Sequence, residues 1–149
     1  SPNLPEGDVY FLGFQKNPYR FFSKASIFVF SSLFEGFPCA LVEALSCGVP
    51  VVSADCRFGP RELLAPNTDF LCETKQPELA EYGVLMPVLN EKNCDTDRVL
   101  SAREIMWVDF LADALEDDDL KKKYSEPGKR RAYDFHIDKI VPQWLECLS

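Results

Sequence analysis

The amino-acid sequence predicts an α/β fold with a parallel sheet, and two observations carry this prediction. The first is a set of three short apolar runs, at residues 9–12, 27–30 and 49–52. None of them alternates apolar with polar residues, so each is typical of a strand covered on both faces, as in parallel sheets. The second is that helical stretches, at about residues 18–25 and 38–48, separate the runs. Strands and helices in this alternation form βαβ units, so we expect a Rossmann-like parallel sheet with flanking helices.

Further elements are expected along the rest of the chain. A short helix is predicted at residues 61–64 and another strand at residues 82–88. The spacing of apolar residues then becomes helical, and Pro127 followed by Gly128 is expected to break the second of these helices. A last helix is predicted at residues 137–148.

Length and composition bound the organisation of the chain. We expect one domain over residues 1–149, with its core at about residues 8–95 and C-terminal helices at about residues 97–149. The formal net charge of −8 argues against broad binding to the phosphate backbone of nucleic acid, which needs a basic face. The six cysteines include no Cys-x-x-Cys pair, so we expect neither a zinc site nor a disulfide framework. A reducing, cytoplasmic compartment fits best, and no apolar run is long enough to span a bilayer.

The helix at residues 38–48 carries an isolated carboxylate. Pro38 suits the first helical position, and Gly48 suits the left-handed residue just past the helix end. Between residues 37 and 54 the only acidic residue is Glu43, with apolar neighbours that predict burial. Because an unpaired buried carboxylate costs several kcal/mol, roughly, we expect Glu43 to bind a ligand. The alternative is that Glu43 bonds to neighbouring backbone or to an arginine.

A ligand is expected beyond the carboxyl ends of the parallel strands, an edge that we call the rim. Loops at residues 13–17, 31–37 and 55–59 would open onto it. The free N–H groups of residues 39–41 would point towards the rim and attract an anion, which makes phosphate the natural ligand class. Glu43 could then accept hydrogen bonds from the two hydroxyls of a ribose. The alternative for the Gly-x-Pro sequence at residues 36–38 is an ordinary helix start.

At this point the sequence resembles a known family. Residues 30–38 (FSSLFEGFP), 41–45 (LVEAL) and 48–52 (GVPVV) resemble the nucleotide-sugar half of family-4 retaining glycosyltransferases with the GT-B fold. Residues 55–64 are similar to the segment that follows in the branch that builds bacterial surface polysaccharides and lipid-linked oligosaccharides. The resemblance covers residues 8–66 strongly and the C-terminal helices loosely.

The resemblance implies a role for each part of the motif. Glu35 would lie near the donor sugar and the reaction centre, and Glu43 would hold the ribose hydroxyls of the nucleotide. The loop at Gly13 and Phe14 would lie close to the base. The residues that the resemblance assigns to the nucleotide-sugar are Gly13, Phe14, Gly36, Phe37, Pro38, Cys39, Ala40 and Glu43. The donor would be a UDP-sugar, and neither an obligatory metal ion nor another cofactor is implied.

The resemblance also implies parts that the chain lacks. The family usually carries an Arg and a Lys on an earlier strand and loop, which neutralise the leaving diphosphate, and an N-terminal half that binds the acceptor. Because charge on a leaving diphosphate needs compensation, we expect this chain alone to be a poor catalyst. Arg57 and Arg61 are candidates for positive charge near the rim. The full enzyme would act in the cytoplasm on a glycan or lipid-linked acceptor. It could also associate peripherally with the inner face of the cell membrane.

Other classes of protein fit the sequence less well. A dinucleotide-binding oxidoreductase would need Gly-x-Gly-x-x-Gly after its first strand, and residues 13–16 lack it. A receiver-like signalling module would need an acidic pair after the first strand, and only Asp55 fits its pattern. A stand-alone nucleotide-binding module without catalytic activity remains the alternative. The single histidine, His136, is expected to be an ordinary helix-start or packing residue.

Overall fold

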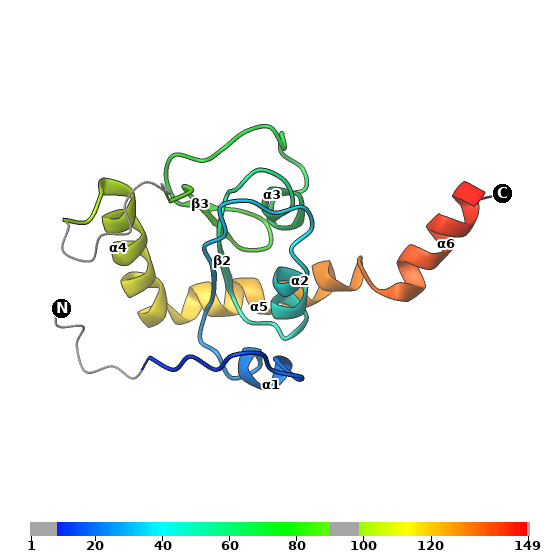
Figure 1. Ribbon diagram of the computed structural model, residues 1–149, viewed down its shortest axis with the longest axis horizontal. Helices are drawn as coiled ribbons and strands as arrows, with labels where there is room; N and C mark the ends of the chain where they lie inside the picture. The colour runs from blue at the N-terminus through cyan, green and yellow to red at the C-terminus, as the bar shows by residue number, and fades with distance from the viewer. Residues whose placement is uncertain (1–8, 90–98, 149) are drawn as a thin grey trace.

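The structure is a computed structural model that describes residues 9–89 and 99–148. It confirms the α/β class, with short strands and helices in alternation followed by three longer helices (Figure 1). The elements in chain order are α1 (Tyr19–Phe22), β1 (Phe28–Phe30), α2 (Cys39–Ser46), β2 (Val51–Ala54), α3 (Pro60–Leu64), β3 (Glu78–Leu79), β4 (Val84–Met86), α4 (Ala102–Glu116), α5 (Asp118–Tyr133) and α6 (Ile137–Leu148).

The strands form one Rossmann-like sheet in the order β1-β2-β4-β3. β1, β2 and β4 are parallel, with Phe28 beside Val51 and Val52 beside Val84, and β3 pairs antiparallel to β4. Every residue of β2 and β4 is buried, as predicted for strands covered on both faces. β1 differs, because it lies at the edge of the described sheet and Val29 is 44 % exposed.

The prediction of a strand at residues 9–12 is wrong. The four side chains are exposed, and the ring of Phe11 is 97 % accessible to solvent. Figure 1 shows the segment along the lower edge of the molecule, on its way to α1. An apolar run becomes a strand only where a neighbouring strand accepts its backbone hydrogen bonds, and among the described residues β1 pairs with β2 alone.

Side chains from the two faces of the sheet form two core clusters. The cluster beneath α2 and α3 contains Leu41, Ala44, Leu45, Val49, Val51, Leu63, Leu64, Ala65, Leu85 and Ala132. The cluster beneath α4 contains Val52, Ala54, Val84, Met86, Trp107, Ala114, Leu120 and Tyr124. α5 contributes to both, since it runs from α4 past the sheet to α2 (Figure 1). Polar groups within these clusters are paired: Trp107 donates from Nε1 to the Pro87 carbonyl at 2.8 Å.

The expected helix break at Pro127 and Gly128 is also wrong, because both residues lie inside α5. A proline within a helix costs roughly 3 kcal/mol, since it removes one backbone hydrogen bond. Four residues spaced four apart on α5 are buried and offset this cost: Leu120, Tyr124, Gly128 and Ala132. Gly128 allows α5 to approach α2 closely, because an added Cβ would lie 3.1 Å from Leu45 Cδ2.

The far end of α5 is attached to α3. Arg131 donates from Nη2 to the Glu62 carbonyl at 2.8 Å and from Nε to the Leu63 carbonyl at 3.0 Å. These carbonyls belong to the last turn of α3, which lacks helical partners for them. α6 follows as predicted, has no buried residue, and extends away from the sheet (Figure 1). No helix in the described part of the chain is long and apolar enough to cross a membrane.

We predict that Gly128→Val lowers the free energy of unfolding by about 1–3 kcal/mol, because the branched side chain overpacks the contact with Leu45. Helix propensity alone would favour valine over glycine by a few tenths of a kcal/mol, so a loss reports on packing. Urea unfolding measures the effect. The control Lys122→Val places the same side chain on an exposed part of α5, and an equal loss in both variants would contradict the packing argument.

Candidate functional site

Two of the three predicted loops meet at the rim. The loop at residues 31–37 leaves β1 and the loop at residues 55–59 leaves β2, and parallel pairing places both strand ends at one edge. Their contact is at Gly59, where an added Cβ would lie 2.4 Å from Pro38 Cδ and 2.8 Å from the Gly36 carbonyl oxygen. Gly59 also has a φ of +87°, which L side chains rarely adopt. Only glycine lets the two loops pack this closely.

Glu35 lies between these loops. Its side chain is half-buried and accepts a hydrogen bond from Ser32 Oγ at 2.6 Å. Burial, and then the negative charge of Glu35, raise the pKa of the Cys56 thiol to about 11. Since Cys56 belongs to the loop after β2, the carboxylate of Glu35 is close enough to act on both loops. Ser32 holds this carboxylate in place at the rim.

The start of α2 differs slightly from the prediction. Pro38 precedes the first helical residue instead of occupying it, and the Leu41 N–H donates to the Pro38 carbonyl at 2.9 Å. The expectation that the Leu41 N–H is free was therefore wrong. The amides of Cys39 and Ala40 donate to no acceptor among the described residues, and Cys39 is exposed. Two amides and the positive end of the helix dipole thus remain for an anion.

Glu43 is half-buried, whereas its apolar neighbours in the sequence predicted that it would be buried. The buried side of α2 is taken by Leu41, Ala44 and Leu45, which leaves Glu43 on the flank of the helix. There it lines an open groove of about 360 Å³ between α1, α2 and the end of α5. We call this the Glu43 groove; its polar and aromatic lining is Tyr19, Glu43, Ser46, Lys129, Tyr133, Phe135 and His136.

Tyr19 lines the same groove and lies close enough to Glu43 to feel its charge. Partial burial, and then the charge and hydrogen bond of Glu43, raise the pKa of the Tyr19 hydroxyl. One carboxylate can accept several hydrogen bonds, so this contact leaves Glu43 able to accept from a ligand in the groove. Lys129 is paired with Glu126 at 2.7 Å. The Glu43 carboxylate is therefore the anionic group of the groove that remains open to ligand hydroxyls.

His136 and Tyr133 line the groove, although no sequence pattern predicts them there. Their rings stack, with centroids 5.4 Å apart and an interplanar angle of 18°. His136 also lies 3.3 Å from a carboxylate oxygen of Asp138. Because α5 ends beside α2, residues almost a hundred positions apart in the sequence line the same cavity. These residues come together because α5 continues through Pro127, where the sequence predicted a break.

Arg61 is bound by carboxylates and cannot serve a diphosphate. Its guanidinium donates from Nε to Asp55 Oδ1 at 3.1 Å and from Nη2 to Glu78 Oε2 at 2.8 Å, and Asp55 and Arg61 are both buried. Burial alone would lower the pKa of Arg61, and the bonds to Glu78 and Asp55 raise it above its ordinary value. Asp55 also accepts from the Thr74 N–H at 2.6 Å. This network holds the chain between α3 and β3 against the end of β2, and Arg57 is left as the exposed cation of the rim loop.

The structure does not bring Gly13 and Phe14 to the rim. The segment that contains them runs along the lower edge of the molecule, whereas the chain that leaves β1 passes over the upper edge (Figure 1). Their expected position depended on a strand at residues 9–12, which is not formed. Phe14 is 92 % exposed.

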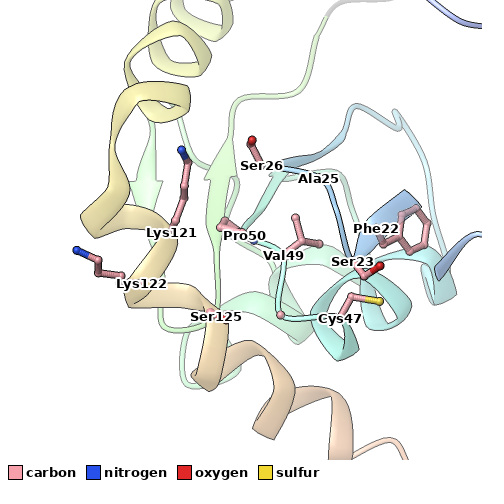
Figure 2. Close-up of a pocket in the computed structure, with 11 residues that line it drawn as sticks. Phe22, Ser23, Ala25, Ser26, Cys47, Val49, Pro50, Lys121, Lys122 and Ser125 are labelled. Atoms are coloured by element: carbon pink, nitrogen blue, oxygen red, sulfur yellow. The ribbon is translucent and has the colours of Figure 1, made fainter. Parts of the chain in front are cut away.

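A second cavity of about 320 Å³ lies at the opposite end of the sheet (Figure 2). It is lined by Val49 and Pro50, just before β2, and by residues at the ends of α1 and α2. Lys121 also lines it, but its Nζ donates to the Leu115 carbonyl at 2.9 Å, and Figure 2 shows the side chain pointing away from Val49 and Pro50. Ligands of open α/β sheets bind at the carboxyl ends of strands, so the rim and the Glu43 groove form the better candidate site.

Comparison with known proteins agrees with this fold. Residues 4–96 match the family described as glycosyl transferases group 1, and the chain belongs to that family. It is a Rossmann-like glycosyltransferase segment, and the matched residues include Glu35, Glu43 and both rim loops.

Relatives of the chain are longer glycosyltransferases. An uncharacterized glycosyltransferase of Methanocaldococcus jannaschii is 41 % identical over 142 residues, which are 93 % of this chain and 35 % of the relative. The N-acetylgalactosamine-N,N'-diacetylbacillosaminyl-diphospho-undecaprenol 4-alpha-N-acetylgalactosaminyltransferase of Campylobacter jejuni is 35 % identical over 98 % of this chain and 33 % of its own length. A lipopolysaccharide 1,6-galactosyltransferase of Escherichia coli is 38 % identical over 45 % of this chain and 20 % of its own. The chain thus spans about a third of the length of the first two.

We predict that Gly59→Ala destabilises the protein by about 2 kcal/mol or more, because its Cβ meets Pro38 and Gly36 and its φ is strained. Thermal unfolding measures the loss. Gly36→Ala is the matched control, since an added Cβ there meets nothing within 4 Å. Similar melting temperatures for the two variants would show that the loops do not depend on the glycine contact.

We predict that Arg61→Leu costs about 3–5 kcal/mol of stability, because Asp55 is left buried without its cation. Adding Asp55→Asn to this variant should recover part of the loss, since it removes the buried charge. Lys122→Ala breaks an exposed pair with Asp119 and should change stability by at most about 0.5 kcal/mol. Chemical denaturation of the three variants gives the comparison, and an Arg61→Leu loss as small as the control's would refute the buried network.

Proposed function

We propose that this chain is the C-terminal, nucleotide-sugar-binding half of a retaining glycosyltransferase with the GT-B fold. Its donor is a UDP-sugar, and the sugar is transferred to a glycan or lipid-linked acceptor in the synthesis of surface polysaccharide. The observation that carries the proposal is that three candidate binding groups lie on α2 or in the loop just before it. Glu35 and the free amides of α2 lie at the rim, and Glu43 lies in the adjoining groove.

The nucleoside is assigned to the Glu43 groove. The groove has a volume of about 360 Å³, which lies near the lower end of the usual range for ligand pockets. This volume suits a small ligand such as a nucleoside. The Glu43 carboxylate accepts from both ribose hydroxyls, which are neighbouring donors with the spacing of its two oxygens. Tyr19 lies beside the carboxylate in the same groove. The stacked rings of Tyr133 and His136 form an apolar and aromatic wall of the same groove.

The diphosphate is assigned to the start of α2. The amides of Cys39 and Ala40 are unpaired within the described residues, and the helix dipole adds positive potential there. Arg57, which is exposed in the loop after β2, supplies a full positive charge near the same edge. These groups provide part of the charge compensation that a leaving diphosphate needs, and the proposed donor site has no obligatory metal ion. The rest of the protein would supply further cations.

The sugar is assigned to the space beside Glu35. When the diphosphate leaves, positive charge develops on the sugar ring, and a fixed carboxylate at that point stabilises it. Ser32 holds Glu35 in one orientation, so the group is ready before the reaction. The acceptor would bind to the part of the protein outside this chain. The Campylobacter jejuni relative is named for a diphospho-undecaprenol substrate, which supports a lipid-linked acceptor. The proposal places this acceptor at the cytoplasmic face of a membrane.

We predict that Glu43→Ala weakens the binding of UDP to the full-length protein about tenfold, because two charge-assisted hydrogen bonds to the ribose are lost. Isothermal titration calorimetry measures the affinity. Glu43→Gln conserves volume and should leave the melting temperature unchanged, which separates binding from folding. Glu116→Ala removes an exposed carboxylate at the end of α4 and serves as the control. Equal affinity of the native and Glu43→Ala proteins for UDP would remove Glu43 from the site.

A further inference from the structure

Phe58 has an unusual backbone conformation. Its φ is +66°, and it is the only described residue other than glycine with a positive φ. This region is costly for a residue with a bulky side chain, and residues held in it cluster at functional sites. The side chain is 52 % exposed, so full burial does not offset the cost of this backbone conformation. The fold gains little from this ring, and glycine would satisfy the same turn without strain.

The loop that carries Phe58 is fixed at both ends. On one side, Asp55 is held by Arg61 and by the Thr74 N–H. On the other side, Gly59 is pressed against Pro38 and the Gly36 carbonyl, and its own N–H donates to Glu62. The ring of Phe58 is therefore presented to solvent by a rigid frame. It cannot relax its φ unless one of these contacts breaks.

The frame places Phe58 beside the proposed reaction centre. The neighbouring residue, Gly59, touches the loop of Glu35, and Cys56, two positions earlier, feels the charge of Glu35. The Arg57 guanidinium lies 5.3 Å from the centroid of the Phe58 ring. An aromatic face, a cation and a carboxylate are thus grouped at one edge of the sheet.

These groups match the parts of a nucleotide-sugar. A pyranose ring has an apolar face of C–H groups, and the negative face of an aromatic ring attracts their partial positive charge. We infer that Phe58 stacks against the sugar ring of the donor, with Arg57 beside it facing the diphosphate. Phe58 is thus a sugar-binding and specificity-determining residue. This inference rests on the proposed function, because it needs a nucleotide-sugar at the rim.

The test compares UDP with UDP-sugars in the full-length protein. The probes are UDP, UDP-N-acetylgalactosamine, UDP-galactose and UDP-glucose, with affinities from calorimetry. Phe58→Gly removes the ring and the strain together. Affinity for the UDP-sugar that the native protein prefers should fall about tenfold, whereas affinity for UDP should stay within about twofold. The melting temperature should be equal to or above the native value, because the strained φ is relieved.

Two further variants complete the design. Phe58→Tyr keeps the aromatic face and should keep the affinity for the UDP-sugar within about threefold. Phe70→Ala removes another exposed phenylalanine, 45 % accessible, from the chain between α3 and β3, and should leave both affinities unchanged.

Each other outcome has a definite meaning. If UDP and the UDP-sugar lose affinity equally in Phe58→Gly, or if neither does, the stacking role is overturned while the proposed function stands. If Phe58→Gly lowers the melting temperature and leaves the preference for the UDP-sugar intact, the ring packs against another part of the protein, which also overturns the inference. If the native protein binds none of the four probes, the proposed function fails and the inference fails with it.

Discussion

The parallel pairing of β1 with β2 is the constraint on which the site depends. Because both strands run in the same direction, the loops that follow them leave at one edge, and Glu35 and Arg57 come to neighbouring positions. The contact of Gly59 with Pro38 and Gly36 then fixes the distance between the loops. The same pairing sets the direction of α2, so that its first amides face the rim and Glu43 lies farther down its flank. The groups proposed to bind the ligand are thereby arranged along α2 and in the two loops at the rim.

The charged residues at the rim fall into two groups, those that stabilise the fold and those proposed to bind the ligand. Arg61 is committed to Asp55 and Glu78, and it stabilises the chain between α3 and β3. Arg57, four positions earlier, has no carboxylate partner among the described residues and remains exposed. Glu35 and Glu43 are half-buried, so neither carries the full cost of an isolated buried charge in the proposed site. Arg57 and Arg61 thus differ in role because their neighbours differ: carboxylates bind Arg61 and leave Arg57 exposed.

Local signals in the sequence predicted the fold class and the helix of the site. Pro38 and Gly48 mark the limits of α2, and Gly48 has the left-handed φ of +70° that its position requires. β2 begins two residues later than the apolar run, at Val51, because Pro50 has no N–H to donate to the ladder. The run at residues 9–12 was misread, since a strand depends on a partner that the run itself does not reveal.

Non-local contacts limited the prediction of the site. Pro127 was expected to end a helix, and burial of one side of α5 against α2 and the sheet overcame it. Because the helix was expected to end at Pro127, Tyr133 and His136 could not be predicted as neighbours of Glu43. The partner of Arg61 in β3, Glu78, lies 17 positions away and shares no local pattern with it. The binding role of Glu43 stays a prediction, and its position on the flank of α2 follows only when Leu41, Ala44 and Leu45 are placed on the buried side.

The hydrogen bonds from Arg131 to the end of α3 decide where the domain can be truncated without losing its fold. The match to the glycosyltransferase family ends at residue 96, and all rim residues precede that point. Yet Arg131 caps α3 through the Glu62 and Leu63 carbonyls, and Ala132 completes the core beneath α2. A fragment cut at the family boundary would keep Glu35, Glu43 and both rim loops. It would lose Tyr133 and His136 of the Glu43 groove, together with the contacts by which α5 supports α2 and α3. The cooperative folding unit therefore extends at least through Phe135, whose ring packs on Phe37 at 5.3 Å.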